Sequence, residues 1–141
     1  MEHNHSHFAA LTAIAAENRV THLRCLDAVN LDPEPIYQIF AVKGEALAEA
    51  MICRVLEDIA HKLDALQNAN RSHSFDEIVQ PARRIASIGA QIGLLDVQQA
   101  AQHVATSAHQ ADGVALSATL ARLERAFDVA VSEVWRFRDH V

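Results

Sequence analysis

The sequence predicts an all-α protein, an antiparallel four-helix bundle with an additional N-terminal helix. Apolar residues recur at three- and four-residue steps through most of the chain, which is the spacing of one helix face, and no stretch alternates as a strand would. Only 4 Gly and 3 Pro interrupt the 141 residues, so long helices are favoured over many short strands. Because 50% of the residues are hydrophobic but only 5% are aromatic, the predicted core is aliphatic.

Residues 1–30 are predicted to be an appendage, a His-bearing tail followed by one helix. His3 lies third from the amino terminus, an arrangement that can hold Cu(II) or Ni(II) in a square plane of nitrogen atoms. The alternative is a solvated terminus in which His3, His5 and His7 bind nothing. The helix is predicted over residues 8–29, with its best apolar positions at Phe8, Leu11, Ile14, Cys25 and Val29.

The bundle itself is predicted over residues 36–141, after a linker with two prolines at residues 30–35. Its helices are expected near residues 36–42, 45–68, 74–92, 95–110 and 114–138, antiparallel across short loops. Ser74 and Glu77 have the spacing of a capping box, and Gly93 is predicted to end the helix that this box begins. The core stripe of the helix near 45–68 is predicted to comprise Leu47, Met51, Val55, Ile59, Leu63 and Leu66, widened by Ile52 and Leu56.

The helix near 74–92 carries two different stripes. The first is apolar and is predicted to face the core, with Ile78, Ala82, Ile85, Ile88 or Gly89, and Ile92. The second is predicted to face outward, with Gln80, Arg83, Ala86, Ser87 and Ala90. Small side chains on an outward face let another protein approach the helix closely. The alternative is that they only let a neighbouring helix of the same chain pack tightly.

Composition excludes several classes of partner. The chain has 12 basic and 18 acidic residues and a net charge of −6, which argues against nucleic acid or an anionic membrane surface as a partner. The longest apolar run near the N-terminus, residues 8–16, is far too short to span a membrane, and its flank is not that of a signal peptide. Cys25 and Cys53 form no C-x-x-C motif, so we expect reduced thiols in a cytoplasmic protein.

No motif in the sequence predicts catalysis or a cofactor. Phosphate-binding loops, dinucleotide fingerprints and nucleophile elbows are all missing, and no Cys and His residues are spaced for zinc. Asp58 with His61, and His73 with Glu77, are the nearest approaches to a di-metal carboxylate pattern, but each occurs once and surface pairing explains both. We therefore predict that the protein is not an enzyme and binds no cofactor.

The order of helices over residues 36–137 resembles the histidine-containing phosphotransfer (Hpt) family. The family signature is His-x-Leu-Lys-Gly, followed by small residues and by a Gly eight positions after the Leu. Ile85 fits the Leu, and Gly93 fits the late Gly. The resemblance implies a four-helix bundle of bacterial two-component phosphorelays that docks a receiver domain on the helix bearing the signature.

The departures from this signature change what the resemblance implies. Arg83 stands at the His position, Ala86 at the Lys position and Ser87 at the Gly position. Because a guanidinium stays protonated, Arg83 cannot accept a phosphoryl group. The prediction is a non-catalytic Hpt-like protein that binds a response-regulator receiver domain or a histidine kinase. Two alternatives stay open: an oligomerisation bundle that pairs two copies through residues 1–30, and metal binding through the N-terminal His residues.

Overall fold

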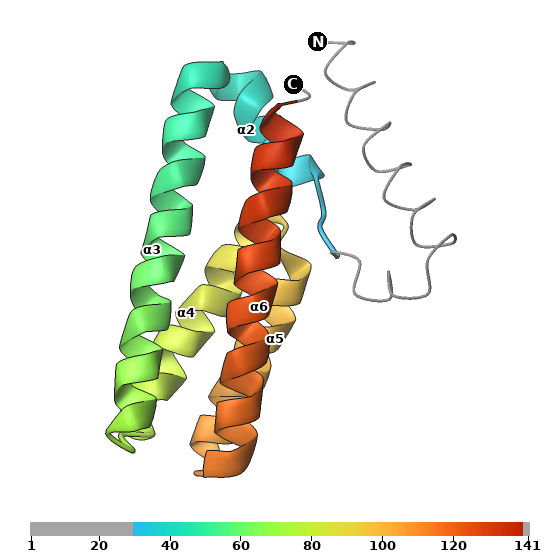
Figure 1. The fold of residues 1–141 in the computed structure, drawn as a ribbon. Helices are drawn as coiled ribbons and strands as arrows, with labels where there is room; N and C mark the ends of the chain where they lie inside the picture. Colours follow the sequence, from blue (N-terminus) through green and yellow to red (C-terminus); the bar gives the residue numbers. More distant parts are fainter. Residues whose placement is uncertain (1–29, 140–141) are drawn as a thin grey trace.

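The structure, a computed structural model, describes residues 30–139 apart from the side chains of Phe137 and Arg138. All regular secondary structure in this range is helical, which confirms the predicted all-α class (Figure 1). The predicted helix and metal-binding tail within residues 1–29 lie outside the described residues. The helices are α2 (Glu34–Lys43), α3 (Glu45–Arg71), α4 (Asp76–Ile92), α5 (Leu95–His109) and α6 (Gly113–Arg138).

The helices differ in length, and this divides the molecule into two levels. Helix α3 has 27 residues and α6 has 26, whereas α4 has 17 and α5 has 15. Helix α4 packs most extensively on α5, then α5 on α6 and α3 on α4. At one end α3 and α6 extend beyond α4 and α5, and α2 lies there between them (Figure 1). Helices α3, α4, α5 and α6 therefore share a core at one level, and α2 lies between α3 and α6 at the other level.

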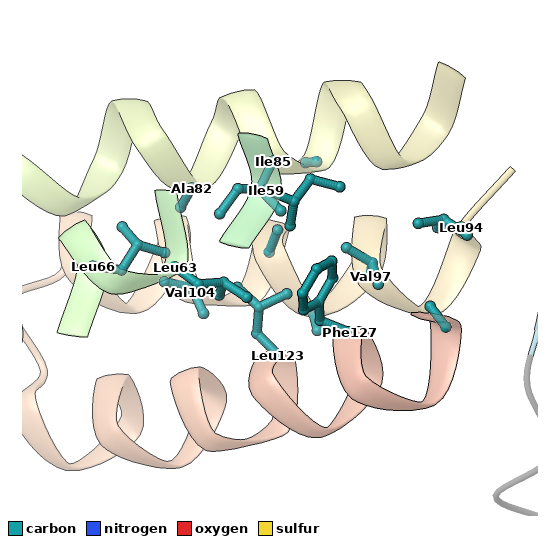
Figure 2. Close-up of a cluster of buried hydrophobic side chains, with 14 of the residues drawn as sticks. Ile59, Leu63, Leu66, Ala82, Ile85, Leu94, Val97, Val104, Leu123 and Phe127 are labelled. Atoms are coloured by element: carbon teal, nitrogen blue, oxygen red, sulfur yellow. The ribbon is translucent and has the colours of Figure 1, made fainter. Parts of the chain in front are cut away.

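The core at the level of α4 and α5 is aliphatic, as the composition predicts. Figure 2 shows side chains from α3, α4, α5 and α6 meeting in one cluster. Burying each Leu, Ile or Val side chain stabilises the fold by roughly 1.5–3 kcal/mol. The labelled members of the cluster are Ile59, Leu63, Leu66, Ala82, Ile85, Leu94, Val97, Val104, Leu123 and Phe127.

The predicted core stripe of α3 is wrong in its first two turns. Leu47 is 53% exposed and Met51 is 38% exposed, while Ile52 is buried as predicted and Ala48, which was not predicted, is buried as well. The stripe from Leu56 onward is buried as predicted. The difference follows from the helix lengths, because α4, which packs on α3 further along the chain, does not reach its first turns (Figure 1).

Three helices end in the same hydrogen-bonded turn, in which a left-handed residue follows the helix. At the end of α4, Gly93 has φ 82°, its N–H donates to the Ala90 carbonyl, and the Leu94 N–H donates to the Gly89 carbonyl at 2.8 Å. This is a Schellman motif, and it confirms that Gly93 ends the helix. The same pattern ends α3 and α5, where the left-handed residues are His73 (φ 55°) and Ala111 (φ 52°).

The predicted capping box at the start of α4 is wrong. Phe75 occupies the cap position, and no side chain caps the first turn. The N–H of Glu77 donates instead to the backbone carbonyl of Ser74 at 3.0 Å, and the N–H of Ile78 donates to that of Phe75. Backbone carbonyls of the turn between α3 and α4 therefore accept from these two N–H groups in place of the Ser74 hydroxyl.

The segment before α2 is bound to the turn between α4 and α5. The Asp32 N–H donates to the Gly93 carbonyl at 2.8 Å, and the Asn30 N–H donates to the Asp96 carboxylate at 2.8 Å. Leu31 forms an isolated β-bridge with Leu94. A side chain at Gly93 would place its Cβ 1.9 Å from the Asp32 carbonyl oxygen. This anchor fixes residues 30–32 on the turn between α4 and α5.

Candidate docking surface on helix α4

Helix α4 holds its outward residues in place by burying the opposite side. Ile78, Ala82 and Ile85 are each 0% exposed and face the core. Gln80, Arg83, Ser87 and Ala90, three and four positions apart, are all exposed. Residues at this spacing share one helix face. We call Gln80, Arg83, Arg84, Ser87 and Ala90 the α4 face.

Ala86 does not belong to this surface, and its predicted outward position is wrong. It is only 6% exposed. Its neighbour on the helix surface, Gly89, lies so close to α5 that an added Cβ would stand 3.2 Å from the Leu94 carbonyl oxygen and 3.3 Å from the Gln98 nitrogen. The small residues of α4 therefore divide into two groups. Ala86 and Gly89 serve packing within the chain, whereas Ser87 and Ala90 stay open.

The α4 face carries positive charge on an acidic chain. Arg83 and Arg84 are both exposed, and within residues 30–139 neither forms an ion pair. No acidic residue occurs between Glu77 and Asp96 in the sequence, so the middle of α4 has no carboxylate of its own. An exposed guanidinium fork can take two oxygen atoms of a partner's carboxylate at once. Arg84 was not singled out from the sequence, although it directly follows Arg83.

An open groove of about 380 Å³ between α3 and α4 borders the α4 face. Helix α3 contributes Asp58, His61, Lys62 and Ala65, and α4 contributes Gln80, Pro81 and Arg84. The Lys62 ammonium group pairs with the Asp58 carboxylate one turn earlier. The groove is therefore lined by a mixture of charges and by the apolar surface of Pro81 and Ala65, and it extends the surface available on α4 toward α3.

The charged groups of the α4 face are guanidinium groups, which can donate hydrogen bonds to a partner's oxygen atoms. Arg83 cannot act as a nucleophile, because its guanidinium stays protonated at cellular pH. Within residues 30–139, no three His, Cys, Asp or Glu side chains are grouped to hold a metal ion. Asp58 and His61 both line the groove, whereas His73 lies in the α3–α4 turn, where its ring and that of Phe75 are nearly perpendicular.

Comparison of the chain with protein-family models, with curated proteins and with solved structures found no match. Among the helices of residues 30–139, none combines the length and the apolar character that a membrane crossing requires. The predicted pairing of two copies through residues 1–30 and the predicted metal site at His3 fall almost wholly outside the described residues and stay predictions.

Proposed function

We propose that α3 to α6 form an antiparallel four-helix bundle of the phosphotransfer kind that has lost its nucleophile. In this proposal the α4 face binds an acidic surface of a signalling partner, a receiver domain or a histidine kinase, and carries no phosphoryl group. The observation that supports it most is the exposed pair Arg83 and Arg84 beside the open small residues Ser87 and Ala90.

The positions that match the family signature agree with this proposal. Arg83 is exposed at the place where the family has its phosphoryl-accepting His. Ile85, two residues later, is buried as the Leu of the signature would need to be. Gly93 takes a left-handed conformation at the end of the helix, which only Gly adopts without strain. Each of these agreements concerns local geometry on one helix.

Charge complementarity favours a receiver domain as the partner. The phosphoryl-accepting site of a receiver is a cluster of carboxylates, and the middle of α4 offers two exposed guanidinium groups with no carboxylate of its own between Glu77 and Asp96. Complementary charges at an interface raise the association rate and exclude partners of the wrong sign. Ser87 and Ala90 let a partner's helix approach the backbone of α4, because neither side chain extends beyond its Cβ by more than one atom. The chain would then occupy a receiver without taking its phosphoryl group.

The test is binding of the full chain to purified receiver domains and histidine kinases from the organism that supplies the sequence. We expect one of them to bind, and the variant Arg83→Glu/Arg84→Glu to weaken that binding at least tenfold, about 1.4 kcal/mol. Arg122→Glu/Arg125→Glu on α6 changes the net charge equally at exposed positions and serves as the matched control. Incubation with the phosphorylated partner should leave no phosphohistidine on the chain. Equal weakening by both variants, or a phosphorylated chain, would contradict the proposal.

A further inference from the structure

Three large apolar side chains near the corner between α2 and α3 stay exposed among residues 30–139. Val42 is 73% exposed, Leu47 is 53% exposed and Met51 is 38% exposed. Leu47 and Met51 lie one turn apart on the same side of α3. The patch belongs to the end of the molecule where α3 and α6 extend beyond α4 and α5 (Figure 1). We call these three residues the α2–α3 patch.

The patch is too small to hold a partner molecule by itself. Stable interfaces between proteins bury about 800 Å² on each partner and engage about 20–30 residues a side. Three large apolar side chains offer far less than this. A segment of the same chain needs a smaller surface, because its tether gives it an effective concentration in the millimolar range.

We propose that residues 8–29 of this chain pack as a helix against α2 and the α2–α3 patch, with residues 8–16 covering Leu47 and Met51. The sequence supplies an apolar surface for this purpose, since Thr12 is the one polar residue between Phe8 and Ala16. An apolar stretch of that kind requires cover in water. The proposal does not depend on the function of the α4 face.

The anchor at Asn30 fixes the position of the residue that follows residues 8–29. The length of these residues as a helix is sufficient to run along α2. Asn30 and Asp32 are fixed on the α4–α5 turn by their hydrogen bonds to Asp96 and Gly93. Helix α2 leads from there toward the patch, and its 10 residues measure about 15 Å. Residues 17–29 as a helix measure about 20 Å, so they can run back along α2 and place residues 8–16 at the patch.

Met51 provides a probe that reports on the patch directly. The sequence has 2 Met, of which Met51 lies in the patch. Peroxide converts an accessible thioether to the sulfoxide. The rate at Met51 in the full chain is measured by mass spectrometry and compared with free methionine in the same solution, with fragment ions separating Met51 from Cys53. A thioether that is uncovered one tenth of the time oxidises about tenfold more slowly than a free one.

Two variants of the segment test what covers the thioether. We expect Leu11→Asp/Ile14→Asp to raise the Met51 rate at least about fivefold, because burying the two carboxylates against the patch is costly. Asn18→Asp/Thr21→Asp adds the same charge at positions that interrupt the apolar stripe and should leave the rate unchanged. Leu11→Ser/Ile14→Ser, which adds no charge, should act in the same direction as the first variant, and circular dichroism checks that all variants keep their helices.

Two results would overturn this proposal. Equal Met51 rates in the wild-type chain and in both apolar-stripe variants would mean that residues 8–16 do not cover the patch. A wild-type rate that falls as protein concentration rises would mean that a second copy covers it instead. The expected wild-type rate is slow and independent of protein concentration.

Discussion

Gly93 is the residue whose replacement most directly tests how the segment before α2 is joined to the bundle. In Gly93→Ala the new Cβ would stand 1.9 Å from the Asp32 carbonyl oxygen, a separation that no pair of atoms sustains, so residues 30–33 must move away. That movement breaks the hydrogen bond from Asp32 to Gly93 and the one from Asn30 to Asp96. Each is worth about 1 kcal/mol. The left-handed conformation costs an Ala side chain about 1 kcal/mol more.

The expected loss in the free energy of unfolding is therefore about 3 kcal/mol. Urea denaturation followed by circular dichroism measures it, and the same experiment on Ala111→Gly supplies the reference. Ala111 ends α5 with the same hydrogen bonds, is exposed and has φ 52°. Ala111→Gly should therefore raise the free energy of unfolding only by the cost of the left-handed conformation, about 1 kcal/mol. If Gly93→Ala loses no more than Ala111→Gly gains, the Asp32 backbone does not lie on this turn and the reasoning fails.

Two further substitutions test the packing of α4 and the end of α3. Ile85→Ala should destabilise the protein by about 3 kcal/mol because Ile85 is fully buried, whereas Ser87→Ala on the exposed face should change stability by less than about 0.5 kcal/mol. Equal effects in thermal unfolding would contradict the orientation of α4. His73→Gly relieves the left-handed strain at φ 55° but removes the edge-on contact between His73 and Phe75, whose ring centres are 6.1 Å apart. It should gain less stability than Ala111→Gly, and an equal or larger gain would show that this ring contact contributes nothing.

The helices were predictable from the sequence because their apolar spacing is regular and their breaks are marked. The predicted helix near 95–110 corresponds to α5 at Leu95–His109, and Gly93 ends α4 as expected. The first turns of α3 were predicted wrongly, because Leu47 and Met51 continue the apolar spacing beyond the point where α4 packs on α3. Spacing records which side chains share a face, but the lengths of neighbouring helices decide which of them are covered.

The turns and the candidate site were only partly predictable for a related reason. Short loops were predicted at both turns, but His73 and Ala111 adopt a left-handed conformation that normally marks Gly, so the sequence did not signal which residue takes it. Ser74 had the spacing of a cap, but the tight turn supplied backbone carbonyls instead. On α4, Ala86 and Ala90 are the same residue type, but Ala86 is buried and Ala90 is exposed. Their positions differ by a single helical turn, and the spacing alone does not tell which of the two is covered.

The proposed role of the α4 face is tested most directly by mapping a bound partner on the chain. Backbone amide shifts are recorded in nitrogen–proton NMR spectra as an unlabelled receiver domain that binds the chain is added. We expect the largest changes at Gln80, Arg83, Ser87 and Ala90, and small changes along the exposed positions of α6. Changes concentrated on α6 or on the α2–α3 patch, with α4 unaffected, would contradict docking on this face.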